Sequence, residues 1–484
     1  MDHFYYVRAG RLVDAKITII TMIFTGKSLL VLGLGRTGQA TVHALEKAGA
    51  HVFTWDDANI IYNTYSEHRL KKIQDIPWQT LAAVIASPGI PFLWPHPHPV
   101  IEESRMRFVP ILSDVDVLRT LAHQAKYIAI TGTNGKSTTT AWLGHVLDPH
   151  QKRQDCAVGG NIGLPALDLP LWDNSKGKYV LELSSYQLEI SQYPLYDISI
   201  FLNLSPDHLI RHGGMEGYIT VKRRIFMNPQ GVAIVGVDDA QGKDLAALLR
   251  KNPTRTVIPI SGERVPEQGI GWQEDWLIDA YSYSEPQRIL SQEDILQGTH
   301  NRQNGAAVYA AAIFCGIEGP ALVKQIKSFK GLEHRQENVL SCAYVTFVND
   351  SKATNADSVM PALKRFHHVY WIAGGRPKEE GIASLTPFWR SIKKAFLIGE
   401  AADSFATLLQ EASVPFEISH TLDRATHAAF AAARQEATAT TPQIVLLSPA
   451  CASFDQFKNF EERGIFFKRC VQKVTEAFHG VCAR

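Results

Sequence analysis

The sequence has almost no excess charge of either sign and few cysteines. Its 484 residues include 49 lysines and arginines against 48 aspartates and glutamates, a formal net charge of +1. No run of basic residues offsets this balance, so there is no electrostatic basis for binding nucleic acid. The six cysteines are scattered, and none forms a Cys-x-x-Cys pair. This spacing argues against a zinc ribbon or a disulfide framework and favours a reducing cytoplasm.

Long apolar runs are missing as well. No stretch approaches the roughly 18 apolar residues of a membrane-spanning helix, so no membrane span is expected. Three basic residues precede a short apolar segment, residues 17–24, but no small-residue cleavage site follows it. The segment therefore imitates a secretory signal only faintly. We interpret residues 1–21 as an extension and Met22 as an alternative start.

Apart from these absences, the composition is that of an ordinary globular protein, with 45% hydrophobic and 20% charged residues. At roughly 100–200 residues per domain, the length predicts two to four domains. Strand-like apolar runs alternate with helical stretches, which predicts an α/β fold with mostly parallel sheets. We expect three domains: a Rossmann-like domain at residues 1–118, a central P-loop ATPase-like domain at 119–331 and a second Rossmann-like domain at 332–484.

The most informative stretch is residues 128–139, Ile-Ala-Ile-Thr-Gly-Thr-Asn-Gly-Lys-Ser-Thr-Thr. An apolar run typical of a buried strand leads into a glycine-rich turn, and Lys136 opens a helix. Such a turn directs backbone N–H groups and the positive end of a helix dipole at one point. Lys136 would contact phosphate oxygens, and the Ser137 hydroxyl would hold Mg²⁺. We therefore predict an ATP site made by Gly132, Thr133, Asn134, Gly135, Lys136, Ser137 and Thr138.

This loop is shorter than the usual P-loop. The first glycine of the common pattern would fall at Ile130, whereas the early glycine here is Gly132. A chance Gly-Lys-Ser turn is the alternative interpretation. The order of strand, turn and helix is the one that a phosphate loop requires, and it favours the nucleotide site.

The first predicted domain carries a different nucleotide-type turn. A buried strand at residues 28–33 leads into Gly33-Leu-Gly35-Arg-Thr-Gly38, a helix and a second strand that ends at Asp56. A G-x-G-x-x-G turn with an acid about 20 residues later binds a nucleotide diphosphate at a helix N-terminus. The turn does not identify the nucleotide, and an NAD-dependent dehydrogenase is one alternative. Asp56 holds a ribose or base, or merely ends its strand. A further strand ends at Ser87-Pro-Gly89, at the edge where open α/β sheets bind ligands.

Polar residues follow the strands of the central domain. Glu182 ends one strand and His208 follows the next, so both are expected at the sheet edge that carries the nucleotide loop. They are donors of the kind that a Mg²⁺–ATP site uses, although Glu182 could equally cap a helix. Lys222 lies in a helical stretch beside two arginines, where a solvated basic face is the simple interpretation. Asn304 heads an alanine-rich helix and could cap it or meet a purine.

Two histidines lie in the segment Trp94-Pro-His-Pro-His-Pro99. Their spacing invites a metal-site interpretation for His96 and His98. Proline on both sides of each histidine instead favours an extended loop without a metal.

Three α/β domains in tandem, with an ATP loop in the second and another nucleotide turn in the first, form an uncommon set. From about Gly26 onward the chain resembles the Mur ligases, the ATP-dependent amino-acid ligases of peptidoglycan precursor synthesis. The last two of the carrying motifs are typical of the members that add D-glutamate. The motifs are Thr131-Gly-Thr-Asn-Gly-Lys-Ser-Thr138, Gly160-Asn-Ile-Gly163, Leu181-Glu-Leu-Ser-Ser185, Asn203-Leu-Ser-Pro-Asp-His-Leu209, Asn349-Asp-Ser-Lys-Ala-Thr-Asn355, and Ser448-Pro-Ala-Cys-Ala-Ser453 with Phe454-Asp-Gln-Phe-Lys-Asn-Phe460.

The resemblance implies a cytoplasmic, monomeric ligase that joins D-glutamate to UDP-N-acetylmuramoyl-L-alanine through an acyl phosphate, using ATP and two Mg²⁺ ions. It implies a CO₂-derived carbamate on Lys222, which would turn an ammonium into a metal-binding anion and replace the basic-face interpretation. The implied catalytic residues are Lys136, Lys222, His208 and Lys352. The implied metal ligands are Ser137, Glu182, His208 and Lys222. Asn304, Arg335 and Asp350 would join the nucleotide loop around ATP.

The remaining implied residues bind the other two substrates. The UDP end would lie at the first-domain turn, which replaces NAD with a UDP-sugar, at Arg36, Thr37, Asp56, Ser87 and Gly89. Asn161 would hold the muramoyl peptide, and D-glutamate would meet Thr354, Lys378, Ser453 and Phe460. Another Mur ligase or a folylpolyglutamate-type ligase is the alternative function, and a regulatory P-loop ATPase is a further one. The chain departs from the family pattern at Ile210, Glu333 and Arg376-Pro377.

Overall fold

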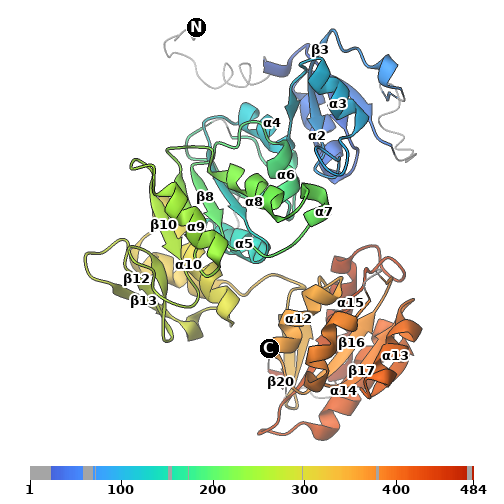
Figure 1. Cartoon of the computed structure of the whole chain (residues 1–484). Helices are drawn as coiled ribbons and strands as arrows, with labels where there is room; N and C mark the ends of the chain where they lie inside the picture. Colours follow the sequence, from blue (N-terminus) through green and yellow to red (C-terminus); the bar gives the residue numbers. More distant parts are fainter. Residues whose placement is uncertain are drawn as a thin grey trace. The chain divides into compact units, whose positions relative to one another are not determined.

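The structure is a computed structural model that describes residues 23–57, 69–70, 72–150, 155–172, 174–296, 298–377, 381–476 and 482–483. The chain divides into two compact units, Met1–Phe329 and Lys330–Arg484. They hold three sheets, two in the first unit and one in the second (Figure 1). The predicted extension and Lys378 lie outside the described residues. Within these ranges, no helix is both long and apolar enough to cross a membrane.

The first sheet has four parallel strands in the order β2-β1-β3-β4. Alternate residues of its central strand face two different cores, since Leu29 and Val31 pack into one cluster and Leu30 and Leu32 into another. This is the two-sided burial expected of a parallel strand covered on both faces. Its elements are β1 (Ser28–Leu32), α2 (Arg36–Lys47), β2 (His51–Trp55), η1 (Ile73–Asp75), β3 (Leu81–Ala86), α3 (Pro99–Met106), β4 (Ile111–Leu112) and α4 (Asp114–Leu121).

The central sheet has nine strands in the order β13-β12-β11-β10-β9-β8-β5-β7-β6. β5 lies between β7 and β8, and all strands from β6 to β10 are parallel. The strands are β5 (Lys126–Thr131), β6 (Cys156–Gly160), β7 (Lys178–Glu182), β8 (Ile198–Phe201), β9 (Val232–Gly236), β10 (Val257–Ile260), β11 (Ile270–Gln273), β12 (Trp276–Asp279) and β13 (Gln287–Ser291). The helices are α5 (Lys136–Leu147), η2 (Ala166–Asp168), α6 (Ser185–Ile190), α7 (Leu209–His212), α8 (Met215–Arg223), η3 (Arg224–Phe226), α9 (Ala240–Leu249), η4 (Gln292–Asp294), α10 (Thr299–Phe314) and α11 (Gly319–Ser328).

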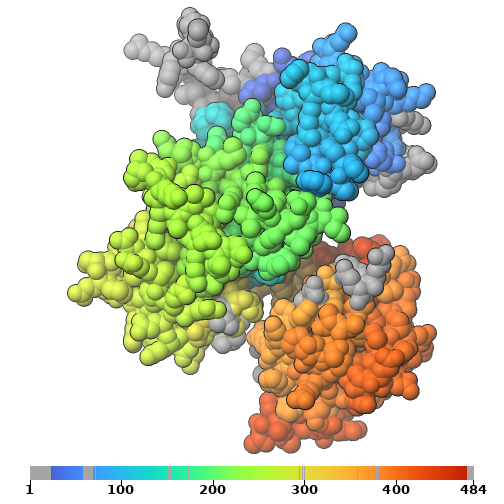
Figure 2. All heavy atoms as spheres, viewed as in Figure 1, coloured from blue at the N-terminus to red at the C-terminus, as the bar shows by residue number. Residues whose placement is uncertain are grey.

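The first and central sheets share a hydrophobic core. One cluster of buried side chains runs from Leu29 and Val31 in β1 to Tyr127 and Ala129 in β5. The atoms of the two regions, blue and green, abut in the space-filling view (Figure 2). Helix α4 joins the two sheets and begins at a capping box, in which Ser113 and Asp116 satisfy each other's backbone N–H groups. Polar loops at the ends of both sheets can therefore be held close together.

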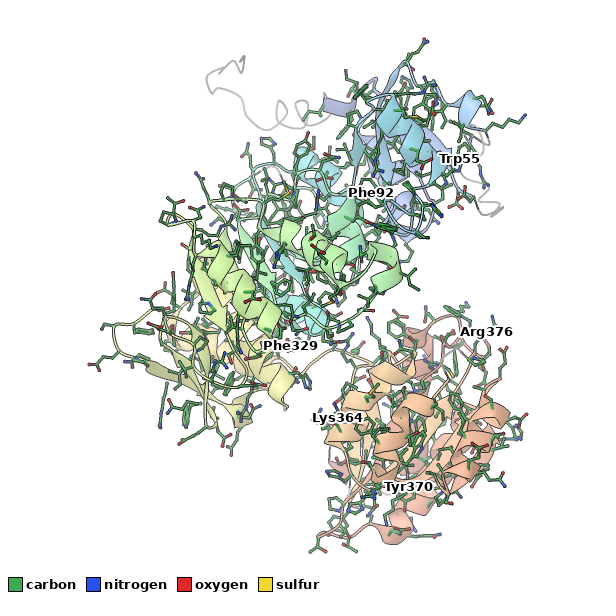
Figure 3. All side chains as sticks on the ribbon, in the orientation of Figure 1. Trp55, Phe92, Phe329, Lys364, Tyr370 and Arg376 are labelled. Atoms are coloured by element: carbon green, nitrogen blue, oxygen red, sulfur yellow. The ribbon has the colours of Figure 1, made fainter. Side chains whose placement is uncertain are left out.

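The second unit is a seven-stranded sheet in the order β18-β17-β16-β19-β15-β14-β20. The strands from β18 to β15 are parallel, and β14 and β20 are antiparallel. Figure 3 labels Tyr370 on β16, and Arg376 just beyond this strand. The elements are β14 (Glu337–Cys342), β15 (Val345–Asn349), α12 (Ala356–Arg365), β16 (Val369–Gly374), η5 (Ala383–Ser391), β17 (Ile392–Ile398), α13 (Ala402–Glu411), β18 (Phe416–His420), α14 (Leu422–Glu436), β19 (Gln443–Leu447), α15 (Phe460–Thr475) and β20 (Cys482–Ala483).

The predicted α/β alternation is confirmed, with two local differences. Helix α2 begins at Arg36, inside the glycine turn that was expected to precede it, because Gly35 is its extended N-cap. Cys342 is in a disulfide, which the scattered cysteine spacing did not predict, and Cys482 stands opposite Cys342 in the β14–β20 register.

Candidate functional site

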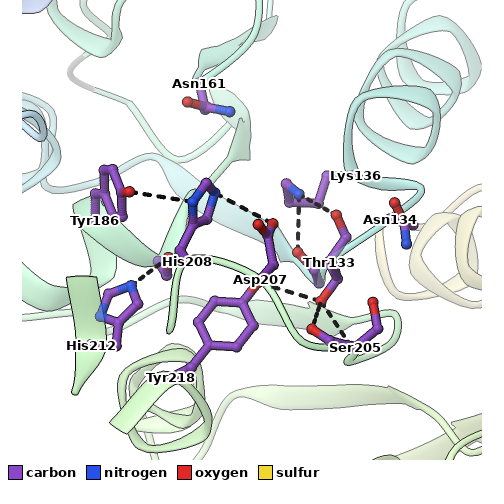
Figure 4. A network of polar contacts seen from close by, with 12 residues as sticks. Thr133, Asn134, Lys136, Asn161, Tyr186, Ser205, Asp207, His208, His212 and Tyr218 are labelled. Atoms are coloured by element: carbon purple, nitrogen blue, oxygen red, sulfur yellow. Dashed lines mark hydrogen bonds and ion pairs between the residues drawn. The ribbon is translucent and has the colours of Figure 1, made fainter. Parts of the chain in front are cut away.

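The predicted nucleotide loop connects β5 to α5. Two of its glycines have positive φ, +151° at Gly132 and +82° at Gly135, so the chain can turn sharply into the helix. A Cβ on Gly135 would lie 2.4 Å from Oδ1 of Asn304, so a larger residue does not fit. Lys136 folds back over the loop, and its Nζ donates to the carbonyl oxygens of Gly132 at 3.0 Å and Thr133 at 2.8 Å (Figure 4). Ser137 and Thr138 are buried in the first turn of α5.

Hydrogen bonds from neighbouring elements hold this loop in place. The backbone N–H of Thr133 donates to the Asn203 carbonyl oxygen at 2.9 Å, and that of Asn134 donates to Asn203 Oδ1 at 2.8 Å. Asn203 Nδ2 in turn donates to Gln303 Oε1 at 3.1 Å, and Gln303 Nε2 to Asp238 Oδ2 at 2.8 Å. The loop is thus tied to the ends of β8 and β9 and to α10. Sequence reasoning missed Gln303 because nothing in its spacing distinguishes it from a surface residue of α10.

Lys222 is buried beside the loop, with only 1% of the residue exposed. Its Nζ donates to the Gly132 carbonyl oxygen at 2.8 Å and to Thr131 Oγ1 at 3.2 Å, and it lies 4.8 Å from the ring centre of Tyr218. Burial, together with the charge of Lys136, lowers the pKa of Lys222 to about 7. The solvated basic face is therefore the wrong interpretation, and a large fraction of the amine is neutral near pH 7.

Glu182 ends β7, next to β5 in the sheet, and is 2% exposed. Its Oε1 accepts a hydrogen bond of 2.7 Å from Asn161 Nδ2. Among the described residues its Oε2 has no hydrogen-bond partner. A buried carboxylate oxygen without a partner is costly unless a cation or donor meets it, so Glu182 suits a metal ligand. The described ranges hold no group of three or more His, Cys, Asp or Glu side chains placed to bind a metal by themselves.

His208 precedes α7 and is held from both sides. Its Nε2 lies 3.3 Å from Asp207 Oδ2, and its Nδ1 lies 3.3 Å from the Tyr186 hydroxyl (Figure 4). His212, one turn later, is buried and makes a 2.9 Å hydrogen bond with Ser185 Oγ. Burial lowers the pKa of His212 to about 4, so this ring is neutral near pH 7, whereas His208 stays half-exposed.

The predicted residues of the first sheet gather around its own glycine turn. Asp56 Oδ2 accepts from the Leu34 backbone N–H at 2.6 Å, and Ser87 Oγ donates to the Gly33 carbonyl oxygen at 2.7 Å. Arg36 reaches into the central sheet, where its Nη2 donates to the Gly163 carbonyl oxygen at 2.9 Å. This hydrogen bond connects the first-sheet turn to the Gly160–Gly163 segment, which carries Asn161. Thr37 lies in the first turn of α2, and Gly89 in the turn after β3.

In the second unit, Asp350 lies at the end of β15. Its Oδ2 accepts from Ser448 Oγ at 2.7 Å, and its Oδ1 accepts from the Gln336 backbone N–H at 3.1 Å. Burial raises the pKa of Asp350 to about 7, although Arg335 and both hydrogen bonds oppose this. Ser448 follows β19, so the Asp350 and Ser448 motifs meet at the carboxyl ends of two adjacent parallel strands.

The other predicted residues of this unit lie on the same two motifs. Lys352 Nζ lies 5.1 Å from the ring centre of Phe460, the first residue of α15. Arg463 joins both motifs, since it is buried and donates to Ser351 Oγ at 3.0 Å and to the Cys451 carbonyl oxygen at 3.1 Å. Ser453 is buried after β19, and Thr354 lies two residues beyond Lys352. Sequence reasoning missed Arg463, because it lies beyond the Phe454–Phe460 motif and no local pattern distinguishes it.

The two histidines of the proline-rich segment have different surroundings. His96 lies in the described loop without a regular element. His98 Nδ1 accepts from the Val100 backbone N–H at 3.1 Å and so caps α3, while its Nε2 lies 3.1 Å from Asp57 Oδ2. Both ring nitrogens of His98 are therefore engaged by protein groups, Nδ1 by the Val100 backbone and Nε2 by Asp57.

The sequence of the chain is similar to those of known proteins. Residues 130–312 match the family described as the Mur ligase middle domain. The UDP-N-acetylmuramoylalanine–D-glutamate ligase of Rhodospirillum rubrum is 44% identical over 463 residues, which cover 93% of this chain and 95% of that protein. The protein of the same name from Caulobacter vibrioides is 44% identical over 470 residues, with 93% and 97% covered.

Solved structures share the fold at low identity. The UDP-N-acetylmuramate–alanine ligase MurC of Thermotoga maritima has a TM-score of 0.54 at 16% identity, covering 92% of this chain and 99% of that one. MurF ligase of Thermotoga maritima, solved in complex with ADP, has a TM-score of 0.52 at 15% identity, covering 94% and 97%. The high identity to the relatives over nearly their full length decides the assignment: the chain belongs to the Mur ligase family, among the UDP-N-acetylmuramoylalanine–D-glutamate ligases.

Proposed function

We propose that the chain ligates D-glutamate to UDP-N-acetylmuramoyl-L-alanine, with cleavage of ATP to ADP and phosphate. The observation that carries this proposal is the 44% identity, over 93% of the chain, to proteins named for this activity. The arrangement of the nucleotide loop with Lys222 and Glu182 supports it, because these groups suit the activation of a carboxylate by ATP. Amide synthesis from a carboxylate needs such activation, since a carboxylate is a poor electrophile.

Each predicted domain would bring one substrate. Residues 1–118 would bind the UDP end at Arg36, Thr37, Asp56, Ser87 and Gly89, and residues 119–331 would bind ATP. Residues 332–484 would bind D-glutamate at Thr354, Lys378, Ser453 and Phe460, and would supply Arg335, Asp350 and Lys352 toward the nucleotide. The bond between Arg36 and the Gly163 carbonyl supports a continuous path for the muramoyl substrate, from the first-sheet turn to Asn161.

The nucleotide loop would hold the triphosphate. Its backbone N–H groups and the start of α5 favour negative charge, and Lys136 would exchange its contacts with the loop carbonyls for phosphate oxygens. Asn304 lies against Gly135 and would face the nucleotide. Ser137, Glu182 and His208 would hold Mg²⁺, and the unpartnered Oε2 of Glu182 fits that duty. When bound, Mg²⁺ would neutralise charge on the transferring phosphoryl group.

Lys222 would be modified before it acts. Its neutral amine would attack CO₂, forming an N–C bond and releasing one proton, and the product is a carbamate anion. The burial that lowers the pKa of Lys222 to about 7 supports this step, because only the neutral amine is nucleophilic. The carbamate would add a second anionic ligand near Glu182.

The reaction would proceed in two chemical steps. The L-alanyl carboxylate would attack the γ-phosphorus of ATP, giving an acyl phosphate and ADP. The amine of D-glutamate would then attack the acyl carbon, and phosphate would leave from the tetrahedral intermediate. His208 or Asp207, whose side chains lie 3.3 Å apart, would take up the amine proton at this stage. Thr354 and Phe460 of the second unit would orient D-glutamate.

One assay tests the function. Phosphate release is measured with ATP and Mg²⁺, in the presence and absence of UDP-N-acetylmuramoyl-L-alanine and of D-glutamate. Release that requires both substrates is the expected result. Release with neither would indicate a regulatory ATPase, release with folate and L-glutamate would indicate a folylpolyglutamate-type ligase, and use of a different amino acid would indicate another Mur ligase. Each of these outcomes contradicts the proposal. We place the activity in the cytoplasm and expect a monomer.

A further inference from the structure

Arg211, on α7, connects the two sheets of the first unit. Its Nη1 forms an ion pair of 2.6 Å with Oε2 of Glu189, the carboxylate on α6. Its Nη2 donates to the carbonyl oxygen of Ile90 at 2.9 Å, and Nη1 lies within 3.5 Å of the Trp94 carbonyl oxygen. One guanidinium group therefore binds the central region and the loop that follows β3 in the first sheet.

The surroundings of Arg211 indicate a fixed contact. Its side chain is 11% exposed and that of Glu189 only 2%. Burial raises the pKa of Glu189 to about 7 although Arg211 opposes this, and the planar guanidinium can meet Glu189 and the loop carbonyls at the same time. A lysine ammonium keeps the charge but lacks the planar set of N–H donors. It therefore cannot reproduce the contacts with Glu189, Ile90 and Trp94 together.

The loop that Arg211 holds is also anchored within the first sheet. Arg105 of α3 donates to the Phe92 carbonyl oxygen at 3.0 Å, and its guanidinium lies 4.4 Å from the Phe92 ring centre. Phe92 lies between the first-sheet and central regions (Figure 3). The indole of Trp94 packs against Gly213, where a Cβ would come within 2.7 Å. The loop begins directly after the Ser87–Gly89 turn.

The other side of Arg211 leads to His208. The Arg211 guanidinium lies 5.0 Å from the ring centre of Tyr186, and the Tyr186 hydroxyl lies 3.3 Å from His208 Nδ1. The Tyr186 and His208 rings are also 5.1 Å apart. Tyr186 thus lies between the Arg211 guanidinium and the His208 imidazole and contacts both.

We propose that Arg211 is a positioning residue that fixes the Ser87–Trp94 segment and His208 in one relative orientation, so that the muramoyl substrate bound on the first sheet meets the reacting groups of the central sheet. This inference rests on the proposed function. Arg211 acts through other groups, and it touches neither the nucleotide loop nor Lys222 in the structure. It should therefore affect the muramoyl substrate and leave the ATP site intact.

Two variants test this role. Arg211→Lys retains a cation beside Glu189 and removes the planar guanidinium donors. The double variant Arg211→Met with Glu189→Gln removes both charges, so no carboxylate is left buried without a partner and folding is preserved. The matched control is Arg224→Lys, because Arg224 is also partly buried and donates to the Leu188 carbonyl at 2.8 Å and to the Ser191 carbonyl, at the end of the same helix α6. Arg224 makes none of the loop contacts.

The readout is a set of steady-state constants, with binding of an ATP analogue measured separately. In both Arg211 variants we expect the KM for UDP-N-acetylmuramoyl-L-alanine to rise at least about tenfold and kcat to fall, as for lost charge-assisted hydrogen bonds. ATP-analogue affinity should stay within about twofold of wild type, as should every constant of Arg224→Lys.

Two results would overturn the inference. One is an unchanged KM for the muramoyl substrate in the folded Arg211 variants. The other is an equal loss of ATP-analogue binding, which marks a general structural role. Failure of the proposed function is separate, because it would appear as wild-type enzyme that releases no phosphate with both substrates.

Discussion

The amine nitrogen of Lys222 lies 2.8 Å from the carbonyl oxygen of Gly132, inside the loop that also carries Lys136. A cationic ammonium here would face the ammonium of Lys136 and would be buried, and both effects oppose charge on Lys222. The proposed carbamate would reverse the sign of this side chain and remove the conflict between the two lysines. The location of Lys222 thus disfavours the ammonium form, and the neutral amine is the form that would react with CO₂.

Replacement of Lys222 by alanine should lower kcat by at least about 100-fold, because it removes a group that would act electrostatically at the reacting phosphate. The measurement is phosphate release with all three substrates. Wild-type activity should also fall in buffer depleted of CO₂ and return when bicarbonate is added. Lys243→Ala, on the exposed face of α9, is the control. Near-normal activity of Lys222→Ala would refute the carbamate role.

Gly135→Ala should abolish binding of an ATP analogue. The substitution introduces a Cβ 2.4 Å from Asn304 Oδ1 at a residue with φ of +82°. Gly316→Ala is the matched control, since its φ is +83° and its Cβ would meet no described heavy atom beyond its chain neighbours within 4 Å. Both variants carry the same backbone strain, and only the first carries the clash. Equal ATP-analogue affinities in the two variants would contradict the steric explanation.

The strands and their ends were predictable because parallel strands buried on both faces are continuous apolar runs. The strand predicted at residues 28–33 lies at Ser28–Leu32, and the strand predicted to end at Asp56 ends at Trp55. The antiparallel strands β11, β12 and β13 were not predicted. Each of β11 and β12 has only four residues, and such short runs carry little periodicity.

The site was predictable only where one residue type carries the chemistry. Lys136 was predicted from the nucleotide-loop motif, and Glu182 from its position at the end of a strand. Lys222 could not be placed from spacing, because helical position alone does not show that Tyr218 and the loop cover it. Arg211 and Gln303 act through contacts between residues far apart in the chain, 121 positions for Arg211 and Ile90, and no local pattern encodes these.

The stability of the second unit should depend on the ionisation of Asp350. Burial raises its pKa to about 7 in the folded chain, against 3.8 for an ordinary, solvent-exposed aspartate. Between these values the folded state binds more protons than the unfolded state, so its stability falls as pH rises from 4 to 7 and is constant above. Asp350→Asn removes this dependence. The calorimetric melting temperature of Asp350→Asn should therefore rise relative to that of wild type as the pH increases from 4 to 7.

Asp403→Asn on exposed α13 is the matched control for that experiment. It makes the same side-chain substitution at an exposed position, so it controls for the chemical change alone. An Asp350→Asn difference that is constant with pH would show that Asp350 titrates in the folded chain as an ordinary surface acid does.

Glu182→Gln should weaken the response to Mg²⁺ while it preserves the fold. The glutamine Oε1 can still accept the hydrogen bond from Asn161, so the local contact survives. The variant replaces the buried, unpartnered Oε2 with an amide nitrogen, which does not bind Mg²⁺. The Mg²⁺ concentration for half-maximal activity should rise at least about tenfold. Glu216→Gln, exposed on α8, should not shift it. An unchanged Mg²⁺ dependence in Glu182→Gln would mean that the unpartnered oxygen meets a donor from the substrate, and the assignment of Glu182 as a metal ligand would be wrong.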